Sequence, residues 1–229
     1  MAPPALPQLL DELSELVARM CVDAAASLRN ATAGLLETRQ RLAEKVVASD
    51  AAMDGLREQV ERVATDALLF HAPVAGDLRQ VVAAIHSSED LQRMGVLARH
   101  VAEAAVRRGT TCAVPDLVRP EFTDMGRVGV ELALKAAEVV RTRNVVLAVE
   151  LDHDDEEMDA LHAQMFDTLV DPSWPHGVGA AVDVTLLARY YERFADHAVL
   201  VADETVRAVT GQGRHDVAEV LEPRRFAVG

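Results

Sequence analysis

Aromatic residues, cysteines and long apolar runs are all scarce in this sequence, and each scarcity excludes a class of protein. Aromatics make up 3% of the 229 residues although apolar residues reach 50%, which favours helices packed through small side chains over sheet. Cys21 and Cys112 stand alone, without spacing for zinc or a redox motif. No stretch is long and apolar enough to span a bilayer. We therefore expect an all-α fold, large enough for one big domain or two small ones.

Basic residues are also in deficit, because 37 acidic residues face 23 basic ones and the net charge is −14. This charge opposes attraction to phosphate backbones and to anionic lipid. The N-terminus has no basic region and soon meets Asp11, Glu12 and Glu15, unlike a signal peptide. We expect a cytoplasmic protein that neither binds nucleic acid nor inserts into a membrane.

What the chain does have is a repeat. Residues 87–105 and 187–205 read alike, with Arg93 aligned to Arg193. In this alignment Gln92 stands opposite Glu192 and Val96 opposite Asp196. The second copy therefore carries a carboxylate pair, four residues apart, that the first copy lacks.

Helical periodicity divides the chain into six long segments. Helices are predicted over 6–47, 49–70, 73–108, 121–151, 154–170 and 175–211. The prolines and threonines of 110–120 indicate a linker, so we predict a three-helix bundle over 1–109, a second over 121–213, and a polar tail over 214–229. The two tandem bundles are related by internal duplication.

The second predicted helix of each half repeats a second acidic pattern. Asp50 and Asp54 lie four apart in the first half, and Asp155 and Asp159 lie four apart in the second. Two acids one helical turn apart repel each other unless a cation or a base lies between them.

The second half therefore contains a candidate metal site. Two helices that each present acids one turn apart can surround a cation, because divalent cations prefer carboxylate oxygens. The four predicted ligands are Asp155, Asp159, Glu192 and Asp196. The alternative is that the first two face solvent near a helix start, and that Glu192 pairs with Arg189 or Arg193.

Other side chains near these acids are weaker candidates. His162 shares the face of Asp159 and offers a nitrogen ligand or a group that orients a carboxylate. Asp203 follows Asp196 by seven residues and extends the stripe, or is an exposed acid near Arg207. His197 points away from Asp196, and we expect it to pack or to support a ligand.

An enzyme is not expected. A di-iron bundle needs Glu-x-x-His on two helices, and the sequence holds one instance, Glu150 to His153. No Walker-type glycine loop opens a helix, and no recognisable pattern places a nucleophile with a base. A phosphotransfer bundle using His86 or His100 remains conceivable but leaves the duplicated acids unexplained.

Three segments carry a resemblance to a known family. The sequence PVAGDLR occupies 73–79, Glu-Arg-Phe-Ala-Asp-His occupies 192–197, and Ala-Arg-Tyr precedes it at 188–190. In this order they resemble the PhoU phosphate-signalling regulators of bacteria. The resemblance implies a cytosolic homodimer of two-bundle chains that negatively regulates phosphate-starvation signalling and phosphate uptake. Its implied partners are the ATPase subunit of a phosphate ABC transporter and a phosphate-sensing histidine kinase.

The resemblance also implies bound transition metal, namely iron, zinc or manganese, at the acidic motifs. Glu192 and Asp196 match the motif in the second half, whereas Gln92 and Val96 replace its two acids in the first. Asp50 and Asp54 are then at most a remnant of a first site. The competing interpretation is a metal-binding or storage bundle without a phosphate-signalling role.

Overall fold

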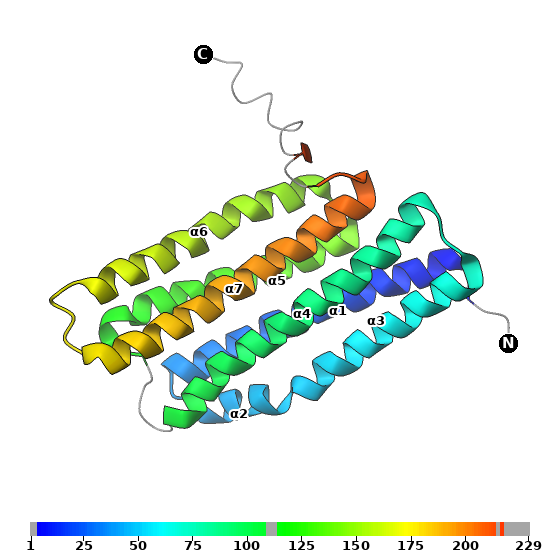
Figure 1. Cartoon of the computed structure of the whole chain (residues 1–229). Coiled ribbons are helices and arrows are strands. Elements are labelled where there is room, and N and C mark those ends of the chain that lie inside the picture. The colour runs from blue at the N-terminus through cyan, green and yellow to red at the C-terminus, as the bar shows by residue number, and fades with distance from the viewer. Residues whose placement is uncertain (1–3, 109–113, 214–215, 218–229) are drawn as a thin grey trace, which may run out of the picture.

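Helices make up nearly all of the computed structural model, which describes residues 4–108, 114–213 and 216–217. These residues contain no strand, and the all-α prediction is confirmed (Figure 1). The long elements are α1 (Leu6–Leu36), α2 (Gln40–Ala48), α3 (Asp50–His71), α4 (Ala75–Arg108), α5 (Arg119–Thr142), α6 (Val145–Val170) and α7 (Gly177–Thr210), with a 3-10 turn at Asp116–Val118.

The helix predicted over 6–47 is wrong, because the chain turns inside it. α1 stops before Thr38, which adopts a φ of 53°, and α2 then folds back. The two helices approach closely at Gly34, where an added Cβ would lie 2.8 Å from Cβ of Ala43. Helical apolar spacing continues through this turn, and threonine rarely adopts a positive φ. Periodicity alone therefore does not reveal the break.

The boundary predicted between helices 121–151 and 154–170 is also wrong. α5 ends at a left-handed Arg143, with φ 52°, and Asn144 caps α6. The Asn144 side chain accepts hydrogen bonds of 3.0 and 3.2 Å from backbone N–H groups of the first helical turn, which is the usual role of asparagine at this position. Apolar residues continue at helical spacing after Asn144, so the sequence pattern predicted one continuous helix across the cap.

The other predicted helices lie close to α3, α4 and α7. The predicted linker, 110–120, lies partly outside the described residues, and so does most of the predicted tail, 214–229. Within the described ranges, no helix combines the length and the apolar character needed to cross a membrane.

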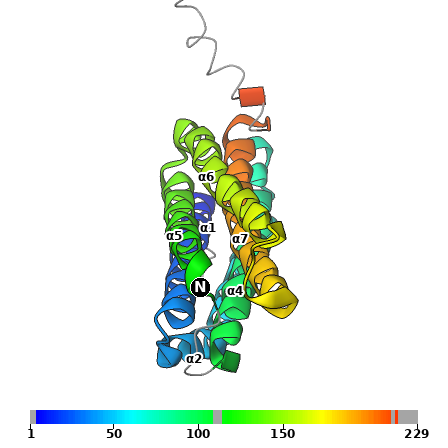
Figure 2. The ribbon, with the colours of Figure 1, turned by 90° about the vertical axis from the view of Figure 1, so that its left-hand side faces the viewer.

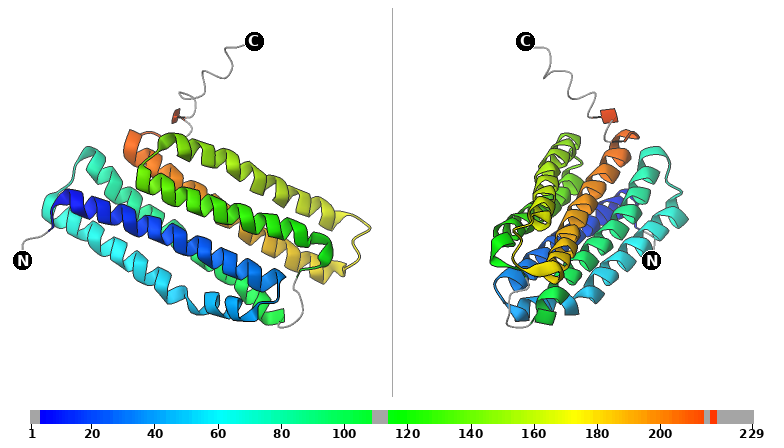
Figure 3. Two further views of the ribbon diagram at one scale, coloured as in Figure 1. Left: turned by 180° about the vertical axis from the view of Figure 1, so that it is seen from behind. Right: turned by 60° about the vertical axis from the view of Figure 1, so that its left-hand side comes forward.

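The helices form two three-helix groups, α1–α3–α4 and α5–α6–α7, as predicted. Figures 2 and 3 show α1 beside α5 and α4 beside α7, with α3 and α6 on the outside. Both central pairs run antiparallel. Near the start of α1 Glu15 pairs with Arg141 at the end of α5, and near the start of α4 His86 faces Glu204 near the end of α7.

The core is continuous across the two groups. An added Cβ at Gly126 would lie 2.6 Å from Cγ2 of Thr32, and one at Gly129 would lie 2.6 Å from Cδ2 of Leu28. Beside this contact the buried Tyr191 hydroxyl lies 2.9 Å from the Thr32 hydroxyl. α1 and α5 therefore pack closely at both glycines, and a larger residue at either position would require Thr32 or Leu28 to move.

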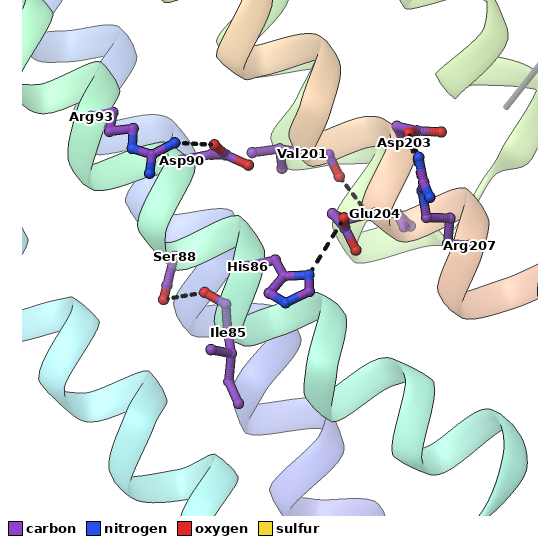
Figure 4. Close-up of polar contacts among 10 residues, drawn as sticks. Ile85, His86, Ser88, Asp90, Arg93, Val201, Asp203, Glu204 and Arg207 are labelled. Atoms are coloured by element: carbon purple, nitrogen blue, oxygen red, sulfur yellow. Dashed lines mark hydrogen bonds and ion pairs between the residues drawn. The ribbon is translucent and has the colours of Figure 1, made fainter. Parts of the chain in front are cut away.

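Polar contacts also tie α4 to α7. His86 Nδ1 lies 3.5 Å from Glu204 Oε1, and one turn further along α4 Asp90 lies beside Arg93 (Figure 4). Asp90 also reaches the buried His197 on α7, whose Nδ1 lies 3.0 Å from Asp90 Oδ1. His197 thus packs between the two halves, as expected for a residue that points away from the acidic face.

Candidate metal centre

Asp155 and Asp159 lie on α6 beside the stripe that enters the core. Leu151, Met158 and Met165 are buried at intervals of seven residues, which is the inner face of a helix. Asp155 is partly buried next to this stripe, whereas Asp159 is exposed. The helical spacing therefore places one acid at the edge of the core and the other at the surface.

Glu192 and Asp196 occupy the corresponding edge of α7. Tyr191, Phe194 and Ala198 are buried and form the inner face of this helix. Glu192 lies next to them with a side chain that is only 12% exposed, and Asp196 is partly buried. Two partly buried carboxylates on one helix thus border the core beside α6, against which α7 packs.

The structure brings the four predicted acids within electrostatic reach of one another. Burial is the largest cause that raises the pKa of Asp155 to about 7. The other causes are negative charges, in descending order those of Asp159, Asp196, Asp152 and Glu192. Asp152, one turn before Asp155, was not predicted from the sequence, because the pattern of paired acids does not include it. Crowded carboxylates of this kind favour a proton or a cation among them.

The two oxygens of Glu192 have different surroundings. Oε1 accepts a hydrogen bond from Nη1 of Arg189, and Oε2 is buried without a hydrogen-bond partner. Burial raises the pKa of Glu192, as does the charge of Asp196, while the charge of Arg189 lowers it. The ion pair considered as an alternative to metal binding is thus present, and it leaves one carboxylate oxygen unpaired.

His162 faces the same group of acids from α6. Burial is the main cause that lowers its pKa, followed by the positive charge of Arg189, while Asp159 and Asp196 oppose the shift. Its ring contacts Phe166 edge-on, with centroids 5.1 Å apart, and its Nε2 is buried without a partner. A neutral imidazole with an unpaired nitrogen is a competent metal ligand.

These side chains suit a transition metal in chemical type. Eight buried side-chain atoms of the described residues have no hydrogen-bond partner, and three of them surround this cluster, namely Asp155 Oδ1, His162 Nε2 and Glu192 Oε2. Carboxylate oxygens with an imidazole nitrogen suit iron, zinc or manganese. Among the described residues, however, no three such side chains are already gathered closely enough to hold an ion. Binding therefore requires side chains to turn toward one another.

Asp203 is paired elsewhere. Its Oδ2 lies 2.7 Å from Nη2 of Arg207, as the alternative for it expected, but its side chain is 13% exposed and so is not the exposed acid of that alternative. Its charge is not among the causes that shift the pKa values of Asp155, His162 or Glu192. We therefore centre the candidate site on α6 and the middle of α7.

In the first half, the side chains at the equivalent positions form contacts with groups of the same half. Gln92, in place of a glutamate, donates a hydrogen bond of 2.6 Å from Nε2 to Oδ1 of Asp54. Arg57, which aligns with His162, pairs with Glu61. The side chain of Asp50 lies outside the described residues. An amide and a guanidinium thus occupy positions that hold a carboxylate and an imidazole in the second half.

Comparison with known proteins places both halves in one family of sequences. A model of the PhoU domain matches residues 17–105 and 122–205. The phosphate-specific transport system accessory protein PhoU homolog 2 of Mycobacterium tuberculosis is 46% identical over 202 residues, covering 88% of this chain and 95% of the relative. The PhoU homolog 1 of Mycobacterium leprae is 44% identical over 207 residues, covering 90% and 93%.

Solved structures share the fold. A crystal structure of PhoU from Pseudomonas aeruginosa superposes with a TM-score of 0.83 at 20% identity, covering 91% of this chain and 100% of that one. The phosphate transport system regulatory protein PhoU of Streptococcus pneumoniae superposes with a TM-score of 0.80 at 18% identity, covering 91% and 98%.

Proposed function

The chain belongs to the PhoU family, and from this membership we propose that it is a cytoplasmic negative regulator of phosphate uptake and phosphate-starvation signalling. It acts as an adaptor, in which one surface contacts the ATPase subunit of a phosphate ABC transporter and another contacts a phosphate-sensing histidine kinase. Catalysis is not part of this role. The names of its relatives, which are accessory proteins of phosphate-specific transport systems, support the process.

The surface supports an adaptor with two contact regions. Large apolar side chains are exposed around the α3–α4 turn, including Leu69 at 71% and Val74 at 73%. Others are exposed around the α6–α7 turn, including Val170 at 74% and Val178 at 81%. The two turns lie at opposite ends of the molecule (Figure 1). Exposed apolar clusters commonly mark protein contacts, and two separate ones suit a protein that holds two partners.

The adaptor role is tested by replacing one apolar cluster at a time. We expect Leu69→Ser with Val74→Ser to weaken co-purification of one partner, and Val170→Ser with Val178→Ser to weaken that of the other. Expression of a phosphate-starvation reporter in phosphate-rich cells should rise in both variants. Circular dichroism checks that each variant remains folded. Full retention of both partners and a silent reporter in both variants would overturn the two-surface proposal.

The second part of the proposal is a carboxylate metal site in the C-terminal group. Asp155 and Asp159 of α6 with Glu192 and Asp196 of α7 would hold iron, zinc or manganese, and His162 would add a nitrogen. The observation that carries this part is the set of buried unpartnered atoms on both helices. A bound ion supplies positive charge between the carboxylates. The residues themselves then link α6 to α7, which stabilises the folded state by mass action.

The metal site is tested by metal analysis of protein purified without a histidine tag. We expect near-stoichiometric metal in the natural protein, and loss of it in Glu192→Ala and in Asp196→Ala. Gln92→Ala, the change in the first half that matches Glu192→Ala, should retain the metal. Many ions per chain would instead favour the storage alternative, and a metal-free natural protein that takes up no Fe²⁺, Zn²⁺ or Mn²⁺ would remove the site from the proposal.

Self-association belongs to the same proposal. We expect a homodimer, and light scattering at several concentrations measures it directly. A mass near 24.8 kDa at all concentrations would mean that the adaptor works as a single chain.

A further inference from the structure

Arg189 occupies a position in which it contacts the acidic cluster and also reaches water. Its Nη1 donates to Oε1 of Glu192, and the side chains are 50% and 12% exposed respectively. The guanidinium thus lies at the solvent edge of a carboxylate that is otherwise buried. A long arginine side chain keeps its charged group hydrated at such a position.

The same guanidinium also acts on the opposite helix. Its charge lowers the pKa of His162 on α6, second only to burial. Arg189 therefore lies near ligand candidates from both helices. The charge of Arg193 also lowers the pKa of Glu192, which makes Arg193 a useful comparison for the effect of charge without this hydrogen bond.

The duplicated half carries an independent clue. The residue aligned with Arg189 is Glu89, and the residue aligned with Glu192 is Gln92. The amide of Gln92 carries no charge, and the residue three positions before it, Glu89, is not a cation. The arginine and the carboxylate therefore occur together in the second half and are both replaced in the first.

We propose that Arg189 is the resident counter-cation of the acidic cluster, and that a metal ion binding there displaces it from Glu192. This inference rests on the proposed metal site. Arg189 holds one oxygen of Glu192, which a metal ion bound by this carboxylate would compete for. A metal ion and a guanidinium repel each other at this range, so the carboxylate exchanges one for the other. Arg189 in this way sets the metal concentration at which the site fills.

The test compares three arginine variants of the full chain. Arg189→Gln removes the proposed counter-cation, and Arg193→Gln removes a nearby charge. Arg207→Gln breaks a distant pair with Asp203 that has similar exposures of 56% and 13%. Each protein is stripped with chelator, dialysed and titrated with Mn²⁺ by calorimetry at constant salt.

We expect Arg189→Gln to bind Mn²⁺ about tenfold more tightly than the natural protein, because the competing cation of a largely buried carboxylate is gone. The Mn²⁺ affinity of Arg193→Gln should increase by about threefold or less, and that of Arg207→Gln should not change. In the stripped proteins, Arg189→Gln should have the lowest melting temperature of the three, because its acids have lost their counter-cation.

Three results would overturn the inference. If the natural protein binds Mn²⁺ and Arg189→Gln binds it equally or more weakly, Arg189 does not compete for the site and the proposed metal site itself stands. If Arg189→Gln and Arg193→Gln increase the Mn²⁺ affinity equally, the increase reflects the loss of a nearby positive charge and not the displacement of Arg189 from Glu192. Absence of Mn²⁺ binding in every protein, and of Fe²⁺ and Zn²⁺ binding in the natural one, would overturn the metal site and with it the exchange.

Discussion

The two halves of this molecule place different polar side chains between equivalent pairs of helices. Where α3 meets α4, the amide of Gln92 donates to Asp54 and closes the contact. Where α6 meets α7, Glu192 replaces that amide and keeps a buried oxygen without a partner. An amide satisfies a carboxylate by itself, whereas a second carboxylate needs a cation or a proton. The exchange of Gln92 for a glutamate thus removes the amide that satisfies an acid in the first half, which is consistent with the proposed cation between the acids of the second.

Removal of metal should produce the largest difference in stability between the two halves. If an ion is present at about a thousandfold excess over its dissociation constant, chelation lowers the free energy of unfolding by about 4 kcal/mol. We expect amide hydrogen exchange to quicken in α6 and in the middle of α7, and to change little in α3. Exchange measured with and without chelator tests this. Equal acceleration in both halves would contradict a single site in the second.

A second carboxylate placed in the first half should destabilise that half, because it would give the first half the unpaired acids of the second. Gln92→Glu would put a carboxylate where Asp54 now accepts a hydrogen bond, and we expect a loss of about 2 kcal/mol in chemical denaturation. Gln92→Met, which removes the hydrogen bond without adding charge, should lose about 1 kcal/mol.

The same variant also serves to rebuild the site. Adding Val96→Asp and Arg57→His to Gln92→Glu reproduces the ligand types of the second half. We expect this triple variant to bind one further equivalent of Mn²⁺ and to recover stability with it. A triple variant that stays metal-free while folded would show that the backbone positions of the two halves are not equivalent.

The pH dependence of metal-stripped protein should sharpen the comparison further. The pKa of Asp155 rises from 3.8 to about 7 on folding, so its contribution is fully present below pH 3.8 and is lost as the pH rises through 7. Because the side chain is partly solvated, we expect a loss of about 1–2 kcal/mol between about pH 4 and pH 7. Denaturation at several pH values measures it. Asp155→Asn should flatten this dependence and Asp54→Asn should not; the same slope in all three proteins would assign it elsewhere.

The smallest expected effect concerns Asp203, which limits the extent of the site. Asp203→Asn weakens an ion pair with the exposed Arg207, and we expect a loss of about 0.5 kcal/mol without any change in Mn²⁺ affinity. Calorimetric titration of this variant checks it. A marked loss of affinity would extend the ligand set along α7.

Periodicity predicted most of the helices, and spacing predicted that the acids of each pair lie one turn apart, because both depend on which residues share a helical face; that the four acids bind a metal stays a prediction. They did not predict the turn at Thr38 or the cap at Asn144, because apolar spacing continues across both. The hydrogen bond between Gln92 and Asp54 was also missed. It depends on how two helices dock, and no local pattern reports that distance.

The contact of α1 with α5 at Gly126 and Gly129 has a mechanical consequence. A residue larger than glycine at either position would have to push Thr32 or Leu28 aside, so the two helix backbones approach closely here. We expect this contact to resist sliding of α5 along α1. Partners proposed to bind at the α3–α4 turn and at the α6–α7 turn would then stay at a set separation.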